Sequence, residues 1–266
     1  MISPRTEAGR RALAALRAEP GRALVALDYD GTLAPVVDRP EDAVPAVGAV
    51  EVLTALADRV GRVALVTGRP AGVVVELGGL AGVPGLVVQG QYGAQRWEAG
   101  RLTTPEPLPG TERLRRLLPD LVAAEGAFLE DKGLSLVVHT RRAPDPAGAL
   151  ERLRPRLEQL AAEAGLEPHP GRLVVELRPP GHDKAGALRA LCVPTPSMVL
   201  FAGDDLGDLA GFDEVDRLRA EGVPALLVCS GSDEGPPELA ARADVVVDGP
   251  QGVVALLESL LRATSR

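Results

Sequence analysis

The chain has 266 residues, of which 45% are hydrophobic and only 2% aromatic, and it carries a formal net charge of −8. This length suffices for one large domain or two smaller ones. The negative charge and the lack of a basic cluster argue against a nucleic-acid partner. The uncharged residues 77–95 are too rich in glycine to favour a membrane span.

The N-terminal residues 1–19 are basic and rich in alanine, but Arg17 and Glu19 interrupt any apolar run. We expect an amphipathic helix there and not a signal peptide. Cys192 and Cys229 lie far apart and lack the spacing of a zinc site, which favours two free thiols in a reducing compartment. We therefore expect a cytoplasmic protein, and a monomeric one.

The apolar residues 23–27 lead into Asp28-Tyr29-Asp30-Gly31-Thr32. An apolar run that ends in turn residues is typical of a buried parallel strand. Because alternate residues of an extended chain point the same way, Asp28 and Asp30 are expected to face one pocket. A hairpin turn at Asp30-Gly31 is the alternative. An EF-hand calcium loop does not fit, since Thr32 and Leu33 stand where Asp or Asn and Gly are needed.

Other expected strands also end in polar residues. Residues 63–66 lead into Thr67-Gly68-Arg69, residues 198–202 lead into Gly203-Asp204-Asp205-Leu206-Gly207-Asp208, and Lys184 opens the helical residues 185–191. Ligands of an open parallel sheet bind outside the carboxyl ends of its strands, so these side chains are expected to converge. Further strands are expected at 85–88, 225–228 and 244–247, and helices at 46–59, 206–220 and 237–243. This alternation predicts an α/β fold with a doubly wound, Rossmann-like parallel sheet.

The alternation breaks between proline-rich segments near residues 105 and 180. Between them we expect strands at 127–130, 134–140 and 173–178. The leucines at 150, 153, 157 and 160 form one helical stripe, in which Pro155 predicts a kink or a break. The sequence therefore predicts a core of residues 1–106 and 180–266 and an inserted α+β domain of residues 107–179.

The acidic residues at the strand ends predict a metal site. Carboxylates in one pocket repel each other unless a cation joins them, and Mg²⁺ takes a few hard oxygen ligands. We expect Asp28, Asp30 (through its backbone carbonyl), Asp204 and Asp205 to bind Mg²⁺, and Asp208 to contact these ligands. Asp205 and Asp208 are each suited to either role. Only two of the 29 basic residues are lysines. One of them, Lys184, would stabilise a transferring phosphoryl group together with Thr67.

The ordered set Asp-x-Asp-Gly-Thr, Thr, Lys and Gly-Asp-Asp-x-x-Asp runs from Asp28 to Asp208 and resembles the haloacid dehalogenase-like phosphatases. The resemblance implies that Asp28 attacks phosphorus and forms an aspartyl-phosphate. It implies that Asp30 protonates the leaving group and then deprotonates the water that hydrolyses the intermediate. It also implies that the inserted domain is a cap that closes over the active site.

Two segments of the expected cap narrow this resemblance. Residues 130–139, Glu-Asp-Lys-Gly-Leu-Ser-Leu-Val-Val-His, and residues 176–184, Glu-Leu-Arg-Pro-Pro-Gly-His-Asp-Lys, resemble the trehalose-6-phosphate phosphatases. That resemblance implies that Glu130, Lys132 and Glu176 hold the distal glucose and that Arg69 lines the mouth of the site. The chain departs from the family pattern at Leu209, where a Glu is common, and at Ala185, where Gly is usual.

These observations predict an Mg²⁺-dependent phosphatase that hydrolyses trehalose 6-phosphate, a small-molecule substrate, in trehalose biosynthesis. One alternative is another sugar-phosphate phosphatase, or a phosphomutase of the same superfamily. The other is a non-catalytic sugar-phosphate sensor, which the presence of Asp28, Asp30, Lys184 and Asp204 disfavours.

Overall fold

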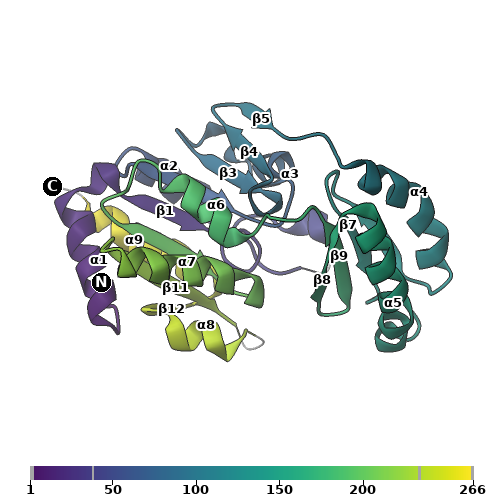
Figure 1. The fold of residues 1–266 in the computed structure, drawn as a ribbon. Coiled ribbons are helices and arrows are strands. Elements are labelled where there is room, and N and C mark those ends of the chain that lie inside the picture. The colour runs from purple at the N-terminus through teal and green to yellow at the C-terminus, as the bar shows by residue number, and fades with distance from the viewer. Residues whose placement is uncertain (1–2, 38, 233–234, 265–266) are drawn as a thin grey trace. The chain divides into compact units, whose positions relative to one another are not determined.

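The computed structural model describes residues 3–37, 39–232 and 235–264. The chain forms two compact units, one made of Met1–Thr103 with Asp183–Arg266 and the other of Thr104–His182 (Figure 1). The second unit contains all of the expected insertion, residues 107–179.

The first unit is built on an eight-stranded sheet in the order β12-β11-β10-β1-β2-β3-β4-β5. The six strands from β12 to β3 pair in parallel, and β4 and β5 continue the sheet as an antiparallel hairpin. The strands are β1 (Leu24–Leu27), β2 (Arg62–Val66), β3 (Val87–Gly90), β4 (Gln95–Glu98), β5 (Arg101–Thr103), β10 (Val199–Gly203), β11 (Ala225–Gly231) and β12 (Val245–Asp248).

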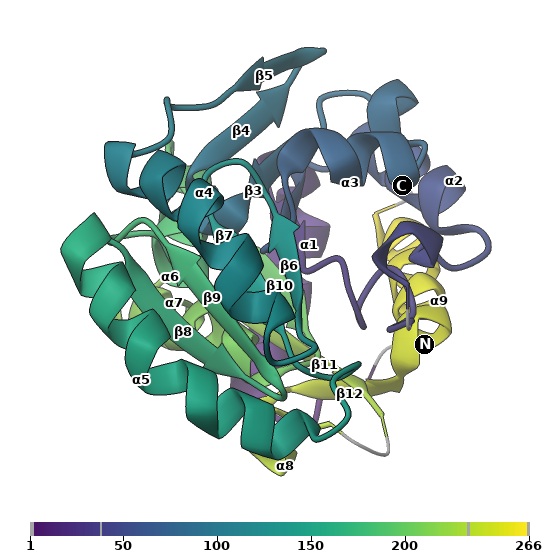
Figure 2. The ribbon, with the colours of Figure 1, turned by 90° about the vertical axis from the view of Figure 1, so that its right-hand side faces the viewer.

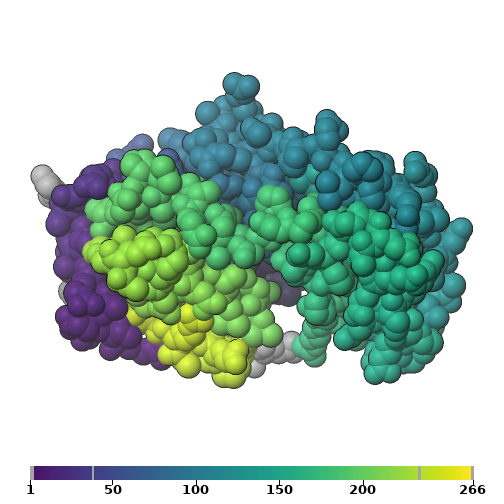
Figure 3. Space-filling view, viewed as in Figure 1, coloured from purple at the N-terminus to yellow at the C-terminus, as the bar shows by residue number. Residues whose placement is uncertain are grey.

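Helices cover both faces of this sheet because its central strands are apolar on both sides. Along β1, Val25 and Leu27 belong to one buried cluster and Leu24 and Ala26 to another. The first cluster includes α1 (Glu7–Ala18), α2 (Ala49–Ala57), α3 (Ala71–Leu77) and α9 (Gly249–Ala263). The second includes α6 (Lys184–Leu191), α7 (Leu209–Ala220) and α8 (Pro237–Arg242), whose atoms cover the face turned to the viewer in Figure 3. The predicted doubly wound α/β fold is confirmed.

The second unit is a four-stranded antiparallel sheet in the order β6-β7-β9-β8, with two helices on one face (Figure 2). Its elements are α4 (Pro109–Ala123), β6 (Phe128–Asp131), β7 (Leu136–His139), α5 (Pro146–Ala164), β8 (Glu167–Gly171) and β9 (Val174–Arg178). The leucine stripe of α5 packs with Leu136 and Val138 in a separate apolar core.

Helix α5 runs continuously from Pro146 to Ala164 through Pro155, where the sequence predicts a kink or a break. Pro155 is exposed, so the Glu151 carbonyl that loses its helical N–H partner lies on the solvent side. Among the described residues, none of the helices combines the length and the hydropathy needed to cross a bilayer.

Candidate active site

The first carboxylates of the site lie where the strand order of the large sheet reverses. Strand β1 ends at Leu27 and is followed by Asp28, and the neighbouring strand β10 ends at Gly203 and is followed by Asp204. The two strands are parallel, with Leu27 opposite Ala202, so both carboxylates leave the same edge of the sheet. The chain continues from β1 toward β2 on one side, while β10 lies on the other. Such a switch point opens a crevice at the carboxyl ends of the strands.

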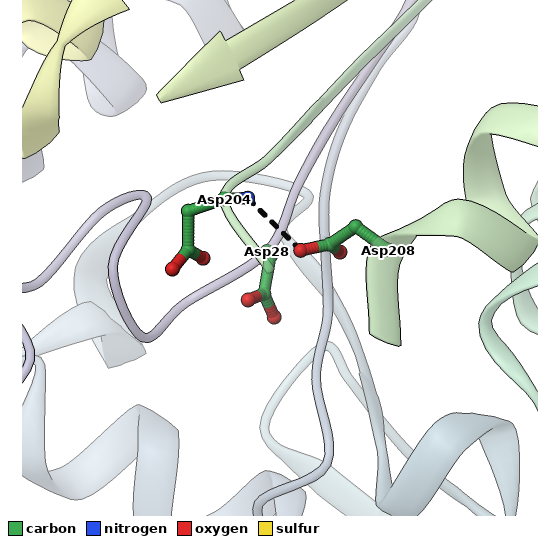
Figure 4. A group of neighbouring side chains, drawn as sticks. All are labelled: Asp28, Asp204 and Asp208. Atoms are coloured by element: carbon green, nitrogen blue, oxygen red, sulfur yellow. Dashed lines mark hydrogen bonds between the residues drawn. The ribbon is translucent and has the colours of Figure 1, made fainter. Parts of the chain in front are cut away.

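Three carboxylates meet at this crevice. Asp28, Asp204 and Asp208 each place a carboxylate oxygen within 4.8 Å of the other two (Figure 4). Asp28 and Asp208 are buried, and Asp204 is half-buried. The donors are all hard oxygens, the ligand type that Mg²⁺ prefers.

Lys184 lies between two of these carboxylates. It is the first residue of α6, whose N-cap, Asp183, accepts a hydrogen bond from the backbone N–H of Gly186. Its Nζ lies 2.9 Å from Asp28 Oδ1 and 2.7 Å from Asp208 Oδ1. Only 5% of the residue is exposed, so the ammonium has exchanged water for two carboxylates.

Burial and mutual repulsion raise the pKa of the acids. Burial raises the pKa of Asp28 well above its ordinary value; Lys184 opposes this shift, while Asp208 and Asp204 add to it. Burial raises the pKa of Asp204 to about 8, and Asp208 and Asp205 contribute to the rise. Burial alone would lower the pKa of Lys184, but Asp208 and Asp28 raise it well above its ordinary value. One ammonium therefore does not neutralise the cluster, and the residues fit a divalent cation.

Asp208 is held from two sides. Its Oδ1 accepts from Lys184, and its Oδ2 accepts from the backbone N–H groups of Asp204 at 3.0 Å and Asp205 at 3.2 Å. Asp205 caps the 3₁₀ turn η5 (Leu206–Asp208) by accepting from the N–H of Gly207. Asp208, which the sequence places behind the ion, thus lies in the acid cluster, whereas Asp205 lies outside it. Which of the two contacts the ion stays a prediction.

The loop after β1 is held against Asp204 by residues for which the sequence suggested no role. Thr32 Oγ1 donates to Asp204 Oδ1 at 3.2 Å, and Ser230, at the end of β11, donates to the carbonyl of Gly31 at 2.7 Å. Gly31 has φ +72°, and a Cβ there would lie 1.9 Å from Asp204 Oδ2. Only glycine allows the loop to approach the carboxylate this closely. The Asp-Gly-Thr motif signals Gly31 and Thr32, but no local pattern signals Ser230.

Asp30 and Arg69 form a bidentate ion pair in the first unit. The guanidinium donates to both carboxylate oxygens at 2.7 Å and to the carbonyl of Pro40 at 2.8 Å. It also lies 5.8 Å from the centre of the Tyr29 ring, whose hydroxyl donates to the carbonyl of Ala43. Arg69 thus fixes the side chain of Asp30, and its expected contact with substrate stays a prediction.

Thr67 follows β2 at the same edge of the sheet and is buried. Its Oγ1 accepts a hydrogen bond from the backbone N–H of Arg69 at 3.1 Å. A hydroxyl that accepts one hydrogen bond still has its own proton to donate. Thr67 is therefore equipped to donate to a phosphoryl oxygen.

The expected sugar-binding residues lie together on the second unit. Glu130 and Glu176 both lie opposite Val137, so they share one face of the sheet. Glu176 Oε1 accepts from Ser135 Oγ at 2.8 Å and lies 3.5 Å from Lys132 Nζ. Glu130 Oε2 lies 2.8 Å from His139 Nε2. Ser135 and His139 are neighbours of the site to which the sequence assigned no role.

Comparison with known proteins identifies the family. A sequence model of the family described as Trehalose-phosphatase matches residues 26–242. The chain belongs to this family. The trehalose-6-phosphate phosphatase of Escherichia coli (strain K12) is 32% identical over 225 residues, which are 82% of each chain. The probable trehalose-phosphate phosphatase of Sinorhizobium fredii (strain NBRC 101917 / NGR234) is 34% identical over 208 residues, 72% of this chain and 73% of the relative.

Solved structures share the fold of this chain. The C-terminal domain of C. albicans trehalose-6-phosphate phosphatase aligns with a TM-score of 0.77 at 21% identity, covering 98% of both chains. A haloacid dehalogenase-like hydrolase from Bacteroides thetaiotaomicron aligns with a TM-score of 0.61 at 16% identity, covering 90% of this chain and 99% of that one. The predicted fold and family are confirmed, and the protein is a phosphatase.

Proposed function

We propose that this protein is an Mg²⁺-dependent phosphatase that hydrolyses trehalose 6-phosphate to trehalose and phosphate. The observation that carries the proposal is the group of three carboxylates around Lys184 at the switch point of the sheet, in a chain of the trehalose-phosphatase family. The named relatives support trehalose 6-phosphate as the substrate.

In the first step, a carboxylate oxygen of Asp28 attacks phosphorus and the bond from phosphorus to the sugar oxygen breaks. Asp30 gives its proton to the departing sugar oxygen, so trehalose leaves as the neutral alcohol. Lys184 keeps Asp28 oriented and places positive charge beside the transferring group. The product of this step is a phosphate ester on Asp28.

In the second step, water attacks the phosphorus of the Asp28 ester and gives a proton to Asp30. The bond from phosphorus to the Asp28 oxygen breaks, which releases phosphate and regenerates both carboxyl groups for the next cycle. The hydroxyl of Thr67 donates to a phosphoryl oxygen in both steps.

The acid cluster would hold the metal ion. Asp28 and Asp204 are the direct ligands in this proposal, with the Asp30 carbonyl and one of Asp205 and Asp208 completing the protein's share. A divalent cation held there would offset part of the negative charge of the carboxylates and the phosphoryl oxygens, which would let the Asp28 carboxylate approach an anionic ester.

The second unit would act as the cap and hold the sugar. Glu130 and Glu176 offer carboxylate oxygens to sugar hydroxyls, and Lys132 offers an ammonium group. The two glutamates already make hydrogen bonds to polar protein groups, Ser135 for Glu176 and His139 for Glu130, and sugar hydroxyls can replace these groups.

Phosphate release from the 6-phosphates of trehalose, sucrose and glucose, each with and without Mg²⁺, tests the proposal. We expect rapid release from trehalose 6-phosphate alone, complete loss in EDTA, and recovery when Mg²⁺ is added. Equal rates on all three sugars, or turnover in EDTA, would contradict it. A requirement for a sugar bisphosphate with little phosphate released would identify a phosphomutase instead.

A further inference from the structure

An exposed phenylalanine lies at the start of β6. The chain has three phenylalanines, and Phe201 and Phe212 are fully buried in the core of the first unit. Phe128 is 52% exposed, although it is the first residue of a strand. Its ring contributes little to the apolar core of the second unit, which is formed by other residues. Burial therefore does not account for an aromatic ring here.

Strand register places Phe128 on the same face as the expected sugar-binding residues. Phe128 lies opposite His139, and Glu130 lies opposite Val137 two residues further along both strands. Residues two apart on a strand point to the same face, and they are separated by about 7 Å. The other face, which includes Leu136 and Val138, packs on the helices. Phe128 and Glu130 are thus adjacent on the face of the sheet that does not pack on the helices, which we call the open face.

His139 contacts both the Phe128 ring and the Glu130 carboxylate. The Phe128 and His139 ring centroids are 6.1 Å apart with an interplanar angle of 38°, within the usual range for an aromatic pair. The same imidazole places Nε2 2.8 Å from Glu130 Oε2. Phe128, His139 and Glu130 therefore form one continuous surface, with an apolar ring at one end and a carboxylate at the other.

This surface matches the chemistry of a pyranose ring, which carries hydroxyls around its rim and C–H groups on its faces. We propose that Phe128 is a further substrate-binding residue, whose ring packs on the C–H face of a glucose unit while Glu130 accepts from its hydroxyls. The assignment rests on the proposed function, because it takes the sugar of the phosphatase substrate as the occupant. It adds an apolar contact to a site that the sequence describes through charged residues only.

Steady-state kinetics of Phe128→Ala on trehalose 6-phosphate and on p-nitrophenyl phosphate, which carries no sugar, test the assignment. We expect the KM for trehalose 6-phosphate to rise about three- to tenfold with kcat within about twofold of wild type. The inhibition constant of trehalose should rise by the same factor, and p-nitrophenyl phosphate turnover should not change.

Three further variants distinguish the contribution of the aromatic ring from that of any exposed apolar side chain on the same unit. Phe128→Trp keeps an aromatic face and should retain a KM near that of wild type, whereas Phe128→Leu should behave like Phe128→Ala. Leu117, on α4 of the same unit, is 50% exposed and serves as the matched control. Leu117→Ala should leave all constants unchanged.

Two results would overturn the assignment while leaving the proposed function intact. One is a wild-type KM and a wild-type trehalose inhibition constant in Phe128→Ala. The other is an equal loss of kcat on both substrates, which would indicate that the ring serves a conformational step and not the sugar. If the wild-type protein itself releases no phosphate from trehalose 6-phosphate, the proposed function fails and the assignment fails with it.

Discussion

The carboxylates of the two units are stabilised in different ways. At the carboxyl edge of the large sheet, Asp28 and Asp208 share one lysine beside Asp204, and burial and repulsion raise the pKa of Asp28 and Asp204. On the open face of the smaller sheet, each glutamate has partners of its own: His139 for Glu130, and Ser135 with Lys132 for Glu176.

The difference shows what each region lacks. The carboxyl edge holds more negative charge than its protein partners neutralise, so its residues fit a cation. On the open face, both glutamates already accept hydrogen bonds from protein donors, and sugar hydroxyls are neutral donors that can take the place of one such as Ser135. Carboxylates are therefore clustered at the carboxyl edge and held apart, each with its own hydrogen-bond partners, on the open face.

Replacing Asp28, the proposed nucleophile, should have the largest effect. Asp28→Asn is expected to lower phosphate release at least about 10⁴-fold on every substrate, because the amide does not form the ester. The free energy of unfolding should not fall, since one of the mutually repelling buried carboxylates is removed. Phosphate assays and urea unfolding measure the two effects. The exposed Asp58→Asn is the control, and turnover by Asp28→Asn above background would refute the covalent mechanism.

Removing the guanidinium beside Asp30 should have the second largest effect. Arg69→Ala is expected to lower kcat for trehalose 6-phosphate by about 10- to 100-fold, because Asp30 is no longer fixed for proton transfer. The loss should be smaller for p-nitrophenyl phosphate, whose leaving group needs no proton, and Arg69→Lys should recover only part of it. Equal losses on both substrates would instead assign Arg69 to phosphate binding.

Changing the open face should affect sugar recognition alone. Glu176→Gln keeps the shape of the side chain but removes its charge, so the KM for trehalose 6-phosphate is expected to rise about tenfold. Turnover of p-nitrophenyl phosphate should stay within about twofold. Glu163→Gln, at an exposed glutamate of α5 paired with Arg113, is the matched control. A similar loss on both substrates would remove the second unit from sugar recognition.

Glu214 offers a test outside both regions. It is 2% exposed on α7; burial alone would raise its pKa, but hydrogen bonds from Arg217 and Arg189 hold the pKa below its ordinary value of 4.5. Since the charged form is favoured in the folded state, its stabilisation is present above pH 4.5 and is lost as the pH falls through the folded-state pKa.

The smallest expected effect follows from this linkage. Glu214→Gln should lower the free energy of unfolding by about 1–2 kcal/mol at neutral pH, a difference that shrinks toward zero in acid. Urea unfolding of the wild type and of Glu214→Gln, at neutral pH and at a pH below the folded-state pKa of Glu214, measures this difference. Glu221→Gln removes an exposed partner of the same Arg217 and should change stability by less than about 0.5 kcal/mol. A Glu214→Gln deficit that persists unchanged in acid would mean that packing, and not charge, is lost.

Much of the carboxyl edge of the large sheet could be predicted from the sequence, because its signals are local. A buried strand such as β1 needs an apolar run, and the polar residue that follows it marks the carboxyl end of the strand. Asp28, Thr67 and Asp204 each stand directly after such a strand, and Lys184 stands at the start of a helix. The edge strands β5 and β8 were missed for the opposite reason. β5 is exposed throughout, and β8 contains Pro168 and Pro170, which an edge strand tolerates.

By itself, the sequence determined the α/β class and the family, because apolar periodicity and short motifs are read within a few neighbouring residues. Only the tertiary structure decided which side chains meet. The contact of Ser230 with Gly31 joins residues 199 positions apart, and Phe128 next to Glu130 on the open face depends on strand register. Such contacts arise from packing and pairing between distant segments, which no local pattern encodes.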